Sequence, residues 1–155
     1  MTEYIFETPS PVGTIVFHLN DRGALTRLSF GGSSGAATAG AAPISPEAVR
    51  VLEQLEAYFA GALRDFDLPI EPEGTAFQIE VWRELRAIPF GKTSTYGEIA
   101  ARIDRKNGQR AVGAASGANP IAIIVPCHRL IGADGALTGY AGGLEIKRAL
   151  LHLEG

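Results

Sequence analysis

The residues most capable of chemistry lie in a short segment that follows a run of five apolar residues, 121–125. Pro126 ends this run, and Cys127, the only cysteine of the chain, is followed directly by His128. A thiolate is a strong nucleophile, and a nearby base or cation generates it at neutral pH. A lone cysteine is also often only a small core residue. The surrounding residues therefore decide whether Cys127 reacts or packs.

His128 is the candidate base for this thiol. Adjacent side chains of an extended segment point to opposite faces, so we expect a proton relay through a water molecule rather than a direct contact between thiol and imidazole. An imidazole in such a relay needs a partner that sets its tautomer, and a carboxylate is the usual one. Spacing alone does not select that partner from the seventeen carboxylates of the chain.

Several motifs in the C-terminal half resemble a known family, the O6-alkylguanine-DNA alkyltransferases (methylated-DNA–protein-cysteine methyltransferases). The motifs that carry the resemblance are Ile-Val-Pro-Cys-His-Arg at 124–129, Thr-Tyr-Gly-Glu at 95–98, Arg-Ala-Val-Gly at 110–113, Asn119-Pro120, Gly-Tyr-Ala-Gly-Gly at 139–143, and Glu154. The N-terminal half shows the resemblance only as a general pattern.

The resemblance implies direct-reversal DNA repair. In that reaction the Cys127 thiolate attacks the O6-alkyl carbon of a guanine, and O4-alkylthymine is an expected second substrate. The target atom is unreachable inside a duplex, so the nucleotide must be flipped out. The resulting thioether lies outside the reversible thiol chemistry, so the protein should react once and stop. No cofactor is expected, because the DNA itself is the alkyl donor.

The residues that the resemblance assigns to catalysis are Cys127, His128, Glu154, Tyr96 and Asn119. Glu154 would complete a relay that runs from carboxylate to imidazole to water to thiol. The hydroxyl of Tyr96 would donate a proton or a hydrogen bond to the base. Asn119 would hold a helix-turn-helix against the cysteine segment through backbone hydrogen bonds.

The residues that the resemblance assigns to DNA or to the flipped base are Arg110, Ala111, Gly113, Thr95, Arg129, Tyr140 and Ala141. Arg110 would fill the space that the base leaves in the stack. Tyr140 would line the base pocket, and the backbone N–H of Ala141 would face the O6 atom.

The chain also departs from some members of the family. Ala141 stands where some members have serine, and Gly117 stands where some have a basic residue. Certain relatives carry a structural zinc in the N-terminal half. This half has no cysteine and His18 is its only histidine, so no metal site is expected.

The 155 residues suffice for one good core or two small ones, and 46% hydrophobic and 20% charged residues are typical of a globular protein. We expect no membrane segment, since no run of about 18 apolar residues occurs. No secretory signal is recognisable, and a free thiol suits a reducing compartment, so a cytoplasmic location is expected. A monomer is expected, and cooperative binding of several copies to DNA is left open.

Charge is divided unevenly along the chain, whose net charge is −3. Residues 1–74 carry four basic and ten acidic side chains, a net charge of −6, whereas residues 75–155 have a net charge of +3. A local basic surface is what phosphate binding requires. The expected partner, double-stranded DNA containing O6-alkylguanine, would therefore bind the C-terminal half.

The predicted fold class is α+β. An N-terminal domain, 1–72, would hold a small antiparallel sheet with a helix, which is ribonuclease H-like. A C-terminal domain for DNA binding and alkyl transfer, 73–155, would be mostly helical, with a helix-turn-helix of winged-helix-like type. Pro72-Glu-Gly74 marks the boundary.

In the first domain, β-branched and aromatic residues predict strands at 3–8, 14–19 and 24–30. Residues 31–45, almost all Gly, Ala, Ser and Thr, predict a flexible loop. Ser45 and Pro46 should begin a helix. Its expected apolar stripe is Val49, Leu52, Leu55 and Phe59, with Gly61 as its end. Alternation of Phe66, Leu68 and Ile70 with polar residues or proline suggests an edge strand.

In the second domain, capping boxes at Thr75–Gln78 and Thr95–Glu98 should begin two helices. Trp82 is expected to pack in the core. A further helix, 110–118, follows a polar turn and makes the helix-turn-helix. Nearly all its side chains are small, which indicates either close helix packing or entry into the narrow minor groove. The last helix should show Ile146, Leu150 and Leu153 on one face and end at Glu154.

Two other functions remain as alternatives. A lesion-binding helix-turn-helix module would need no chemistry, and relatives of that kind replace the cysteine. A cysteine hydrolase would need an oxyanion hole, for which the sequence has no signature. The repair alkyltransferase is the leading hypothesis.

Overall fold

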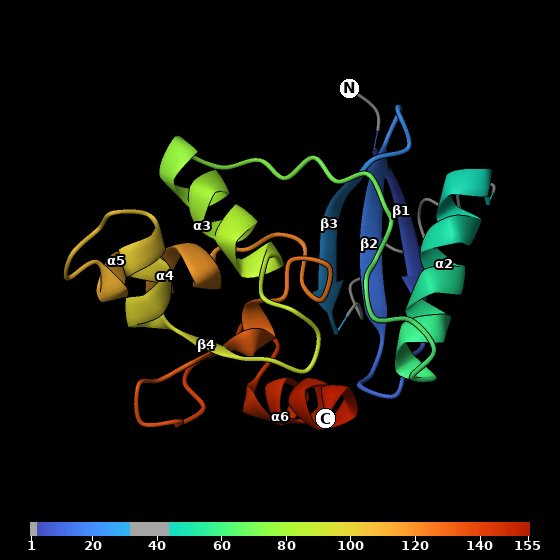
Figure 1. Cartoon of the computed structure of the whole chain (residues 1–155). Helices are drawn as coiled ribbons and strands as arrows, with labels where there is room; N and C mark the ends of the chain where they lie inside the picture. Colours follow the sequence, from blue (N-terminus) through green and yellow to red (C-terminus); the bar gives the residue numbers. More distant parts are fainter. Residues whose placement is uncertain (1–2, 32–43) are drawn as a thin grey trace. The chain divides into compact units, whose positions relative to one another are not determined.

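A computed structural model describes residues 3–31 and 44–155 of the chain (Figure 1). The predicted loop at 31–45 falls almost entirely outside these residues. The chain divides into two compact units, Met1–Pro72 and Glu73–Gly155. The observed α+β class is the predicted one, with a three-stranded sheet and a helix in the first unit and a mainly helical second unit.

The first unit is built on an antiparallel sheet of order β1-β2-β3. Its strands are β1 (Glu3–Thr8), β2 (Ile15–Asn20) and β3 (Leu25–Phe30). The predicted hairpin and third strand are thus present to within one residue. The central strand β2 is almost wholly buried, and Ile15 and Phe17 are fully inaccessible. The sheet thereby supplies one face of a hydrophobic core.

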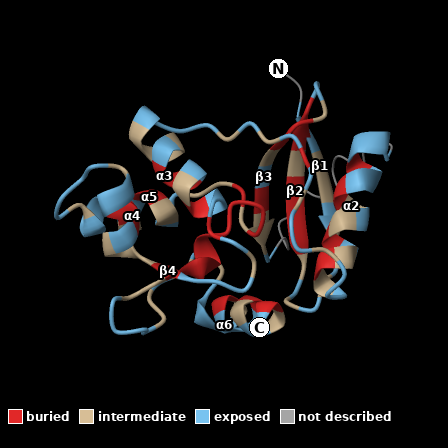
Figure 2. Ribbon diagram, viewed as in Figure 1, coloured by how far each residue is buried: buried red, intermediate tan, exposed pale blue. Residues whose placement is uncertain are grey.

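Helix α2 (Pro46–Phe59) lies beside this sheet and begins as predicted, because the side chain of Ser45 accepts a hydrogen bond from the Ala48 N–H at 3.1 Å. The predicted apolar stripe is right only in part, because Leu55 is buried, Leu52 and Phe59 are half-buried and Val49 is exposed. The buried positions are Ala48, Val51, Leu55 and Tyr58, and Val49 is exposed. Figure 2 shows this buried stripe along α2. The observed buried face includes Ala48 and Tyr58, which are less hydrophobic than Val49 and Phe59, so a stripe chosen by hydrophobicity alone missed them.

The predicted edge strand at 66–70 is also wrong. Only Ile70 pairs, in a single parallel bridge with Leu25. The Leu25 N–H donates to the Pro69 carbonyl at 2.8 Å, and the Glu71 N–H donates to the Leu25 carbonyl at 2.9 Å. Pro69 and Pro72 lack an N–H, so the segment cannot extend this pairing into a regular strand.

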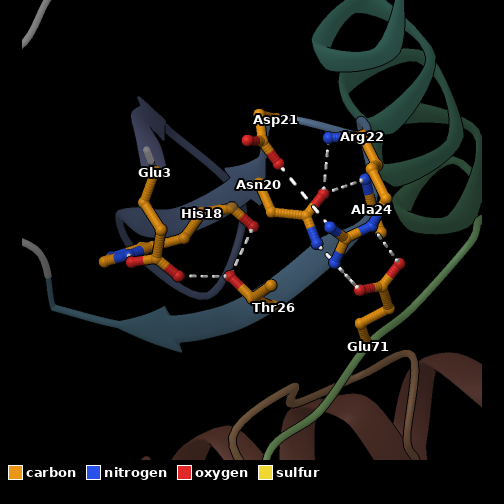
Figure 3. Close-up of polar contacts among 8 residues, drawn as sticks. All are labelled: Glu3, His18, Asn20, Asp21, Arg22, Ala24, Thr26 and Glu71. Carbon is orange, nitrogen blue, oxygen red and sulfur yellow. Dashed lines mark hydrogen bonds and ion pairs between the residues drawn. The ribbon is translucent and has the colours of Figure 1, made fainter. Parts of the chain in front are cut away.

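A polar network closes the turn between β2 and β3 (Figure 3). The Asn20 side-chain oxygen accepts hydrogen bonds from the N–H groups of Arg22 and Ala24, each at 3.0 Å. Its amide nitrogen donates to Glu71 at 3.0 Å, and Arg22 forms an ion pair with the same carboxylate. One buried asparagine thus ties the turn to the end of the 66–71 segment.

The second unit contains four α-helices among its described elements, and a short parallel pair of strands joins two of its segments. Its elements are α3 (Ala76–Arg86), β4 (Ser94–Thr95), α4 (Tyr96–Arg102), α5 (Gln109–Gly117), the 3₁₀-helix η1 (Cys127–Arg129), β5 (Leu130–Ile131) and α6 (Leu144–Glu154). Both predicted capping boxes form. Trp82 is buried in the core as predicted, and its indole N–H donates to the Ala115 carbonyl at 2.8 Å, which ties α3 to α5.

Two features of this unit position its chemistry. Helices α4 and α5 pack against one another as a helix-turn-helix, with Asp104 and Asn107 of the turn in the left-handed region. Strand β4 pairs in parallel with β5, Ser94 opposite Leu130 and Thr95 opposite Ile131. Since Tyr96 follows β4 and Cys127–Arg129 precedes β5, the pairing ties the start of α4 to the cysteine segment.

Candidate active site

Two tight turns bring the chain to Cys127. The first turn is centred on Ile123, and in it the Ile124 N–H donates to the Ala122 carbonyl at 2.8 Å. The φ of Ile123 is +71°, which is a strained value for a β-branched residue. The Cys127 N–H donates to the Val125 carbonyl, also at 2.8 Å, around Pro126. Cys127 itself begins the 3₁₀-helix η1. The segment around Cys127 is therefore turned rather than extended, and the expected relay through a water molecule stays a prediction.

Cys127 is buried, with 8% of the residue exposed, and its thiol is held by Asn119. The amide nitrogen of Asn119 lies 3.2 Å from the sulfur and donates to the Val125 carbonyl at 2.9 Å, while its oxygen accepts from the Ile121 N–H at 3.0 Å. Burial raises the pKa of the thiol, and the Asn119 hydrogen bond and the positive charge of Lys147 act in the opposite direction. The site therefore holds a protonated thiol beside groups that favour its thiolate.

His128 is fully buried and pairs with Glu154 from the last turn of α6. Its Nε2 lies 2.7 Å from a Glu154 oxygen. Since an ionised carboxylate only accepts, Nε2 carries the proton and Nδ1 is left as the basic nitrogen. Among the described residues, Nδ1 has no hydrogen-bond partner. Burial lowers the pKa of His128, so the neutral imidazole is the form present at neutral pH.

Arg129 differs from the expectation that it contacts DNA or the base. It is 5% exposed, and its guanidinium binds both oxygens of Glu154, at 2.8 and 3.0 Å. A third nitrogen donates to the Ile88 carbonyl at 2.6 Å. These hydrogen bonds turn Arg129 inward. Its position makes it a support for Glu154, and this corrects the expected role at the DNA surface.

Lys147 is a second buried cation, which the sequence analysis did not anticipate. Its side chain on α6 is almost inaccessible, and its ammonium group donates to the carbonyls of Leu130 at 2.6 Å and Thr138 at 3.1 Å. Burial lowers the pKa of Lys147, and negative charge on Cys127 would raise it. One lysine therefore connects the strand after the cysteine to the loop before α6.

Tyr96 stands at the first position of α4 and is held by three elements. Its backbone follows the N-cap Thr95, and its ring lies against α5, where a Cβ at Gly113 would be 3.4 Å from a ring carbon. Its hydroxyl shares a hydrogen bond with the Thr138 side chain. Gly113 was expected to contact DNA or the base, and the structure places it beside Tyr96. A methyl group at position 113 would be in van der Waals contact with that ring.

An open cavity of about 800 Å³ adjoins Tyr96. Its lining residues are Thr95, Tyr96, Gly97, Asn107, Gln109, Arg110 and Ala133. Three of the expected site residues, Thr95, Tyr96 and Arg110, thus line one concave surface on the helix-turn-helix. Cys127 is not among the lining residues.

The remaining expected residues lie around this surface or behind it. Arg110 and Ala111 are exposed at the start of α5, whose buried face consists of Val112 and Ala115. Ala141 is exposed, and Tyr140 is partly buried. Burial raises the pKa of Tyr140, and the negative charges of Cys127 and Glu154 act in the same direction, so this phenol stays neutral.

Sequence reasoning missed Lys147 and Thr138. Lys147 occupies a position three residues before Leu150 on the final helix, and this spacing places it on the same buried face. That spacing is a signal that could have marked it. Nothing in the local sequence marks Thr138, because its partner Tyr96 is 42 residues away.

Neither a metal site nor a membrane span is found in the described part of the chain. Over residues 3–31 and 44–155, no three His, Cys, Asp or Glu side chains are grouped so as to hold a metal ion. Within the same ranges, none of the helices has the length and apolar character that crossing a membrane requires.

The two halves of the chain match two family descriptions. Residues 4–72 match the 6-O-methylguanine DNA methyltransferase ribonuclease-like domain, and residues 76–155 match the 6-O-methylguanine DNA methyltransferase DNA-binding domain.

Individual proteins are similar over most or all of the chain. A methylated-DNA–protein-cysteine methyltransferase of Methanosarcina acetivorans is 64% identical over 66% of this chain and 65% of its own length, so the match spans a little less than two thirds of that relative. The Haemophilus influenzae protein of the same name is 46% identical over 94% of this chain and 83% of its own. The crystal structure of Mycobacterium tuberculosis OGT in complex with DNA is 44% identical, with a TM-score of 0.87, and covers 97% of this chain and 92% of that one.

Proposed function

Because the chain belongs to the 6-O-methylguanine DNA methyltransferase family, we propose that it repairs DNA by moving the alkyl group of O6-alkylguanine to Cys127. The observation that carries this proposal is the set of contacts around the single cysteine. Asn119 lies 3.2 Å from its sulfur, and the neighbouring His128 is oriented by Glu154 at 2.7 Å. A cysteine that only packed in the core would need neither a buried base nor a buried carboxylate.

The first step of the proposed reaction generates the nucleophile. The basic Nδ1 of His128 accepts the thiol proton through a bridging water, and Glu154 stabilises the imidazolium that forms. Asn119 and the Lys147 charge stabilise the thiolate. The buried ion pair with Arg129 keeps the Glu154 carboxylate in place for this role.

The second step transfers the alkyl group. The sulfur attacks the alkyl carbon in line, an S–C bond forms as the C–O6 bond breaks, and the released electron pair moves onto the guanine. Tyr96 donates a proton to the ring as this charge develops. The proton held by His128 then returns to the Tyr96 phenolate through solvent, so the net change is one proton gained by guanine and one thiol converted to a thioether. No turnover follows, because the thioether has no route back to the thiol.

Recognition of duplex DNA is assigned to α5 and the turn before it. Gln109, Arg110, Ala111, Ala114 and Gly117 are exposed along α5, and the last three of these are alanine or glycine. A surface of this kind fits the minor groove, which is about 6 Å wide. Arg110 would enter the space left by the flipped base, and exposed Arg102, Arg105 and Lys106 would contact phosphates. The binding partner is proposed to be double-stranded DNA that contains O6-alkylguanine, bound by a monomer.

The decisive experiment mixes the protein with a duplex containing one O6-methylguanine and measures intact and peptide masses. We expect one methyl group per protein, located on the Cys127 peptide, and none with Cys127→Ser. Tight binding without an adduct would favour a lesion-binding module instead. Repaired DNA with unmodified protein would refute the mechanism.

A further inference from the structure

We propose that Thr138 is a positioning residue for alkyl transfer, which acts by donating its hydroxyl proton to the phenol oxygen of Tyr96. The inference rests on the proposed function and adds to it a residue outside the motifs that relate this chain to its family. The observation behind it is the hydrogen bond between the Tyr96 hydroxyl and the Thr138 Oγ1.

A hydrogen bond between two hydroxyls has one donor and one acceptor. If Tyr96 donated to Thr138, its proton would be directed away from an incoming base. If Thr138 donates, the phenol O–H is free to turn toward the cavity that Tyr96 lines. The phenol then donates to the base while it accepts from Thr138. A base that approaches Tyr96 therefore selects the second arrangement.

The same arrangement supports the charge that develops during transfer. As Tyr96 passes its proton to the leaving guanine, negative charge grows on the phenol oxygen. A hydroxyl donor already bound to that oxygen stabilises the charge more strongly than it stabilises the neutral phenol. Thr138 would thus contribute mainly to the rate of transfer and little to the binding of DNA.

Thr138 is held well enough for this task. Its carbonyl accepts a hydrogen bond from the buried Lys147 ammonium at 3.1 Å, and the same ammonium binds the Leu130 carbonyl at 2.6 Å. Its methyl group lies near Gly132, where a Cβ would be 3.6 Å away. Because a threonine side chain has few allowed rotamers, these contacts aim the hydroxyl at Tyr96. Lys147 thereby links the loop to the strand that follows the cysteine.

The test compares four proteins in single-turnover transfer from an O6-methylguanine duplex at saturating DNA. Thr138→Val keeps the shape and removes the hydroxyl, so we expect the transfer rate to fall about tenfold, as for loss of one hydrogen bond to a charged group. Thr138→Ser keeps the hydroxyl and should react within about twofold of the wild type, and DNA affinity should not change in either variant. Thr26→Val is the matched control, since it removes a hydroxyl bonded to Glu3 in the first unit and should not alter the rate.

A double-mutant cycle with Tyr96→Phe shows whether Thr138 acts through Tyr96. We expect Thr138→Val to have no further effect once the phenol is absent. An equal fall in both backgrounds, a fall in DNA affinity alone, or an unchanged rate would overturn the proposal. Thr138→Ala replaces the valine variant if that does not fold. If the wild type itself forms no adduct on Cys127, the proposed function fails. If the wild type reacts and Thr138→Val reacts equally fast, only the role of Thr138 fails.

Discussion

Glu154 shows how a single buried carboxylate serves two neighbours. One of its oxygens accepts from Arg129, and the other accepts from both Arg129 and His128. A buried carboxylate without partners would be costly, and Arg129 offsets that cost through two parallel hydrogen bonds. The Glu154 oxygen that faces His128 accepts the proton of Nε2 and thereby sets the tautomer of the imidazole. The proposed base therefore depends on an arginine that never needs to contact DNA.

The rate of alkyl transfer should fall in acid because of His128. Burial lowers the pKa of this imidazole from its ordinary value of 6.5, so it loses its proton at a lower pH than a free histidine. Protonation removes the base, and the rate should therefore be constant near neutrality and fall only below about pH 6.5. Single-turnover rates across the acid range measure this limb, with DNA affinity as the control. A rate that already decreases on acidification from pH 8 to pH 7 would contradict the assignment of His128 as the base.

The free energy of unfolding should also decrease in acid because of His128. Below pH 6.5 the unfolded chain binds a proton on His128 that the folded chain resists, since the folded pKa is depressed. The stability that neutral His128 contributes is therefore complete above pH 6.5, and it is lost as the pH falls from 6.5 toward the lower pKa of the folded state.

Lys147→Met should reduce both stability and thiol reactivity. The substitution leaves the carbonyls of Leu130 and Thr138 without their buried donor, which costs about 1–3 kcal/mol for each unsatisfied group. It also removes a charge that lowers the pKa of Cys127, so less thiolate forms at a given pH. Urea unfolding and transfer rates measure the two effects.

The control for this substitution is Arg148→Met, which changes an exposed cation next to Lys147 on α6. It should alter stability by no more than about 0.5 kcal/mol. Equal stability and equal transfer rates in the two variants would show that the buried hydrogen bonds and charge of Lys147 contribute nothing beyond those of an exposed cation.

At the scale of elements, the two faces of α5 differ in burial although both carry mainly small residues. Val112 and Ala115 face the interior, and Ala115 accepts the indole hydrogen bond that ties α5 to α3. Gly113 leaves room for the Tyr96 ring. The exposed face carries long side chains only in its first turn, at Gln109 and Arg110, and alanine or glycine at 111, 114 and 117. The small residues thus permit close packing, one of the two interpretations that the sequence left open, and entry into the minor groove stays a proposal.

Arg110→Ala should distinguish base flipping from chemistry. Arg110 is exposed at the first turn of α5 and makes none of the hydrogen bonds around Cys127, so its loss should not change transfer from the free modified base. Transfer from a duplex should fall at least about tenfold, since flipping costs a few kcal/mol and the variant no longer fills the vacated stack. Parallel assays on the two substrates measure this difference. Arg102→Ala, another exposed cation, is the control and should mainly weaken DNA affinity. An equal loss on both substrates would refute the role of Arg110.

At the scale of the whole molecule, the net positive charge and the only cysteine both lie in the second unit. Residues 75–155 have a net charge of +3 in a chain whose total is −3. The partners of Cys127 and His128 come from two other segments, Asn119 from the loop after α5 and Glu154 from the last helix. A change at the sulfur therefore affects the packing of several elements together.

Alkylation of Cys127 should destabilise the protein. The sulfur is buried and lies 3.2 Å from the Asn119 amide, so a methyl group there must displace a hydrogen-bonded neighbour. Overpacking of this kind costs typically about 1–3 kcal/mol, which lowers Tm by roughly 2–4 °C per kcal/mol in a chain of this size. Thermal unfolding before and after reaction with the methylated duplex measures the shift, with unmethylated duplex as the control. An unchanged or higher Tm would show that the site accommodates the methyl group without strain.

The sequence by itself determined the features that depend on neighbouring residues. Ser45, Thr75 and Thr95 begin helices because each side chain binds an N–H three residues ahead, and this requires no distant partner. The hairpin strands likewise follow from local alternation and turn residues. The motif around Cys127 identified the candidate nucleophile, and the resemblance supplied Glu154 as the partner of His128.

Only the tertiary structure decided the rest. The buried face of α2 depends on how Ala48 and Tyr58 pack within their unit, and periodicity alone chose Val49 instead. Arg129 and Lys147 are charged, so their types indicated a surface, but Glu154 and two backbone carbonyls allow both to be buried. Thr138 meets Tyr96 across 42 residues. Burial of a polar group is favourable only when distant segments supply its partners, and their arrangement is a property of the fold rather than of the local sequence.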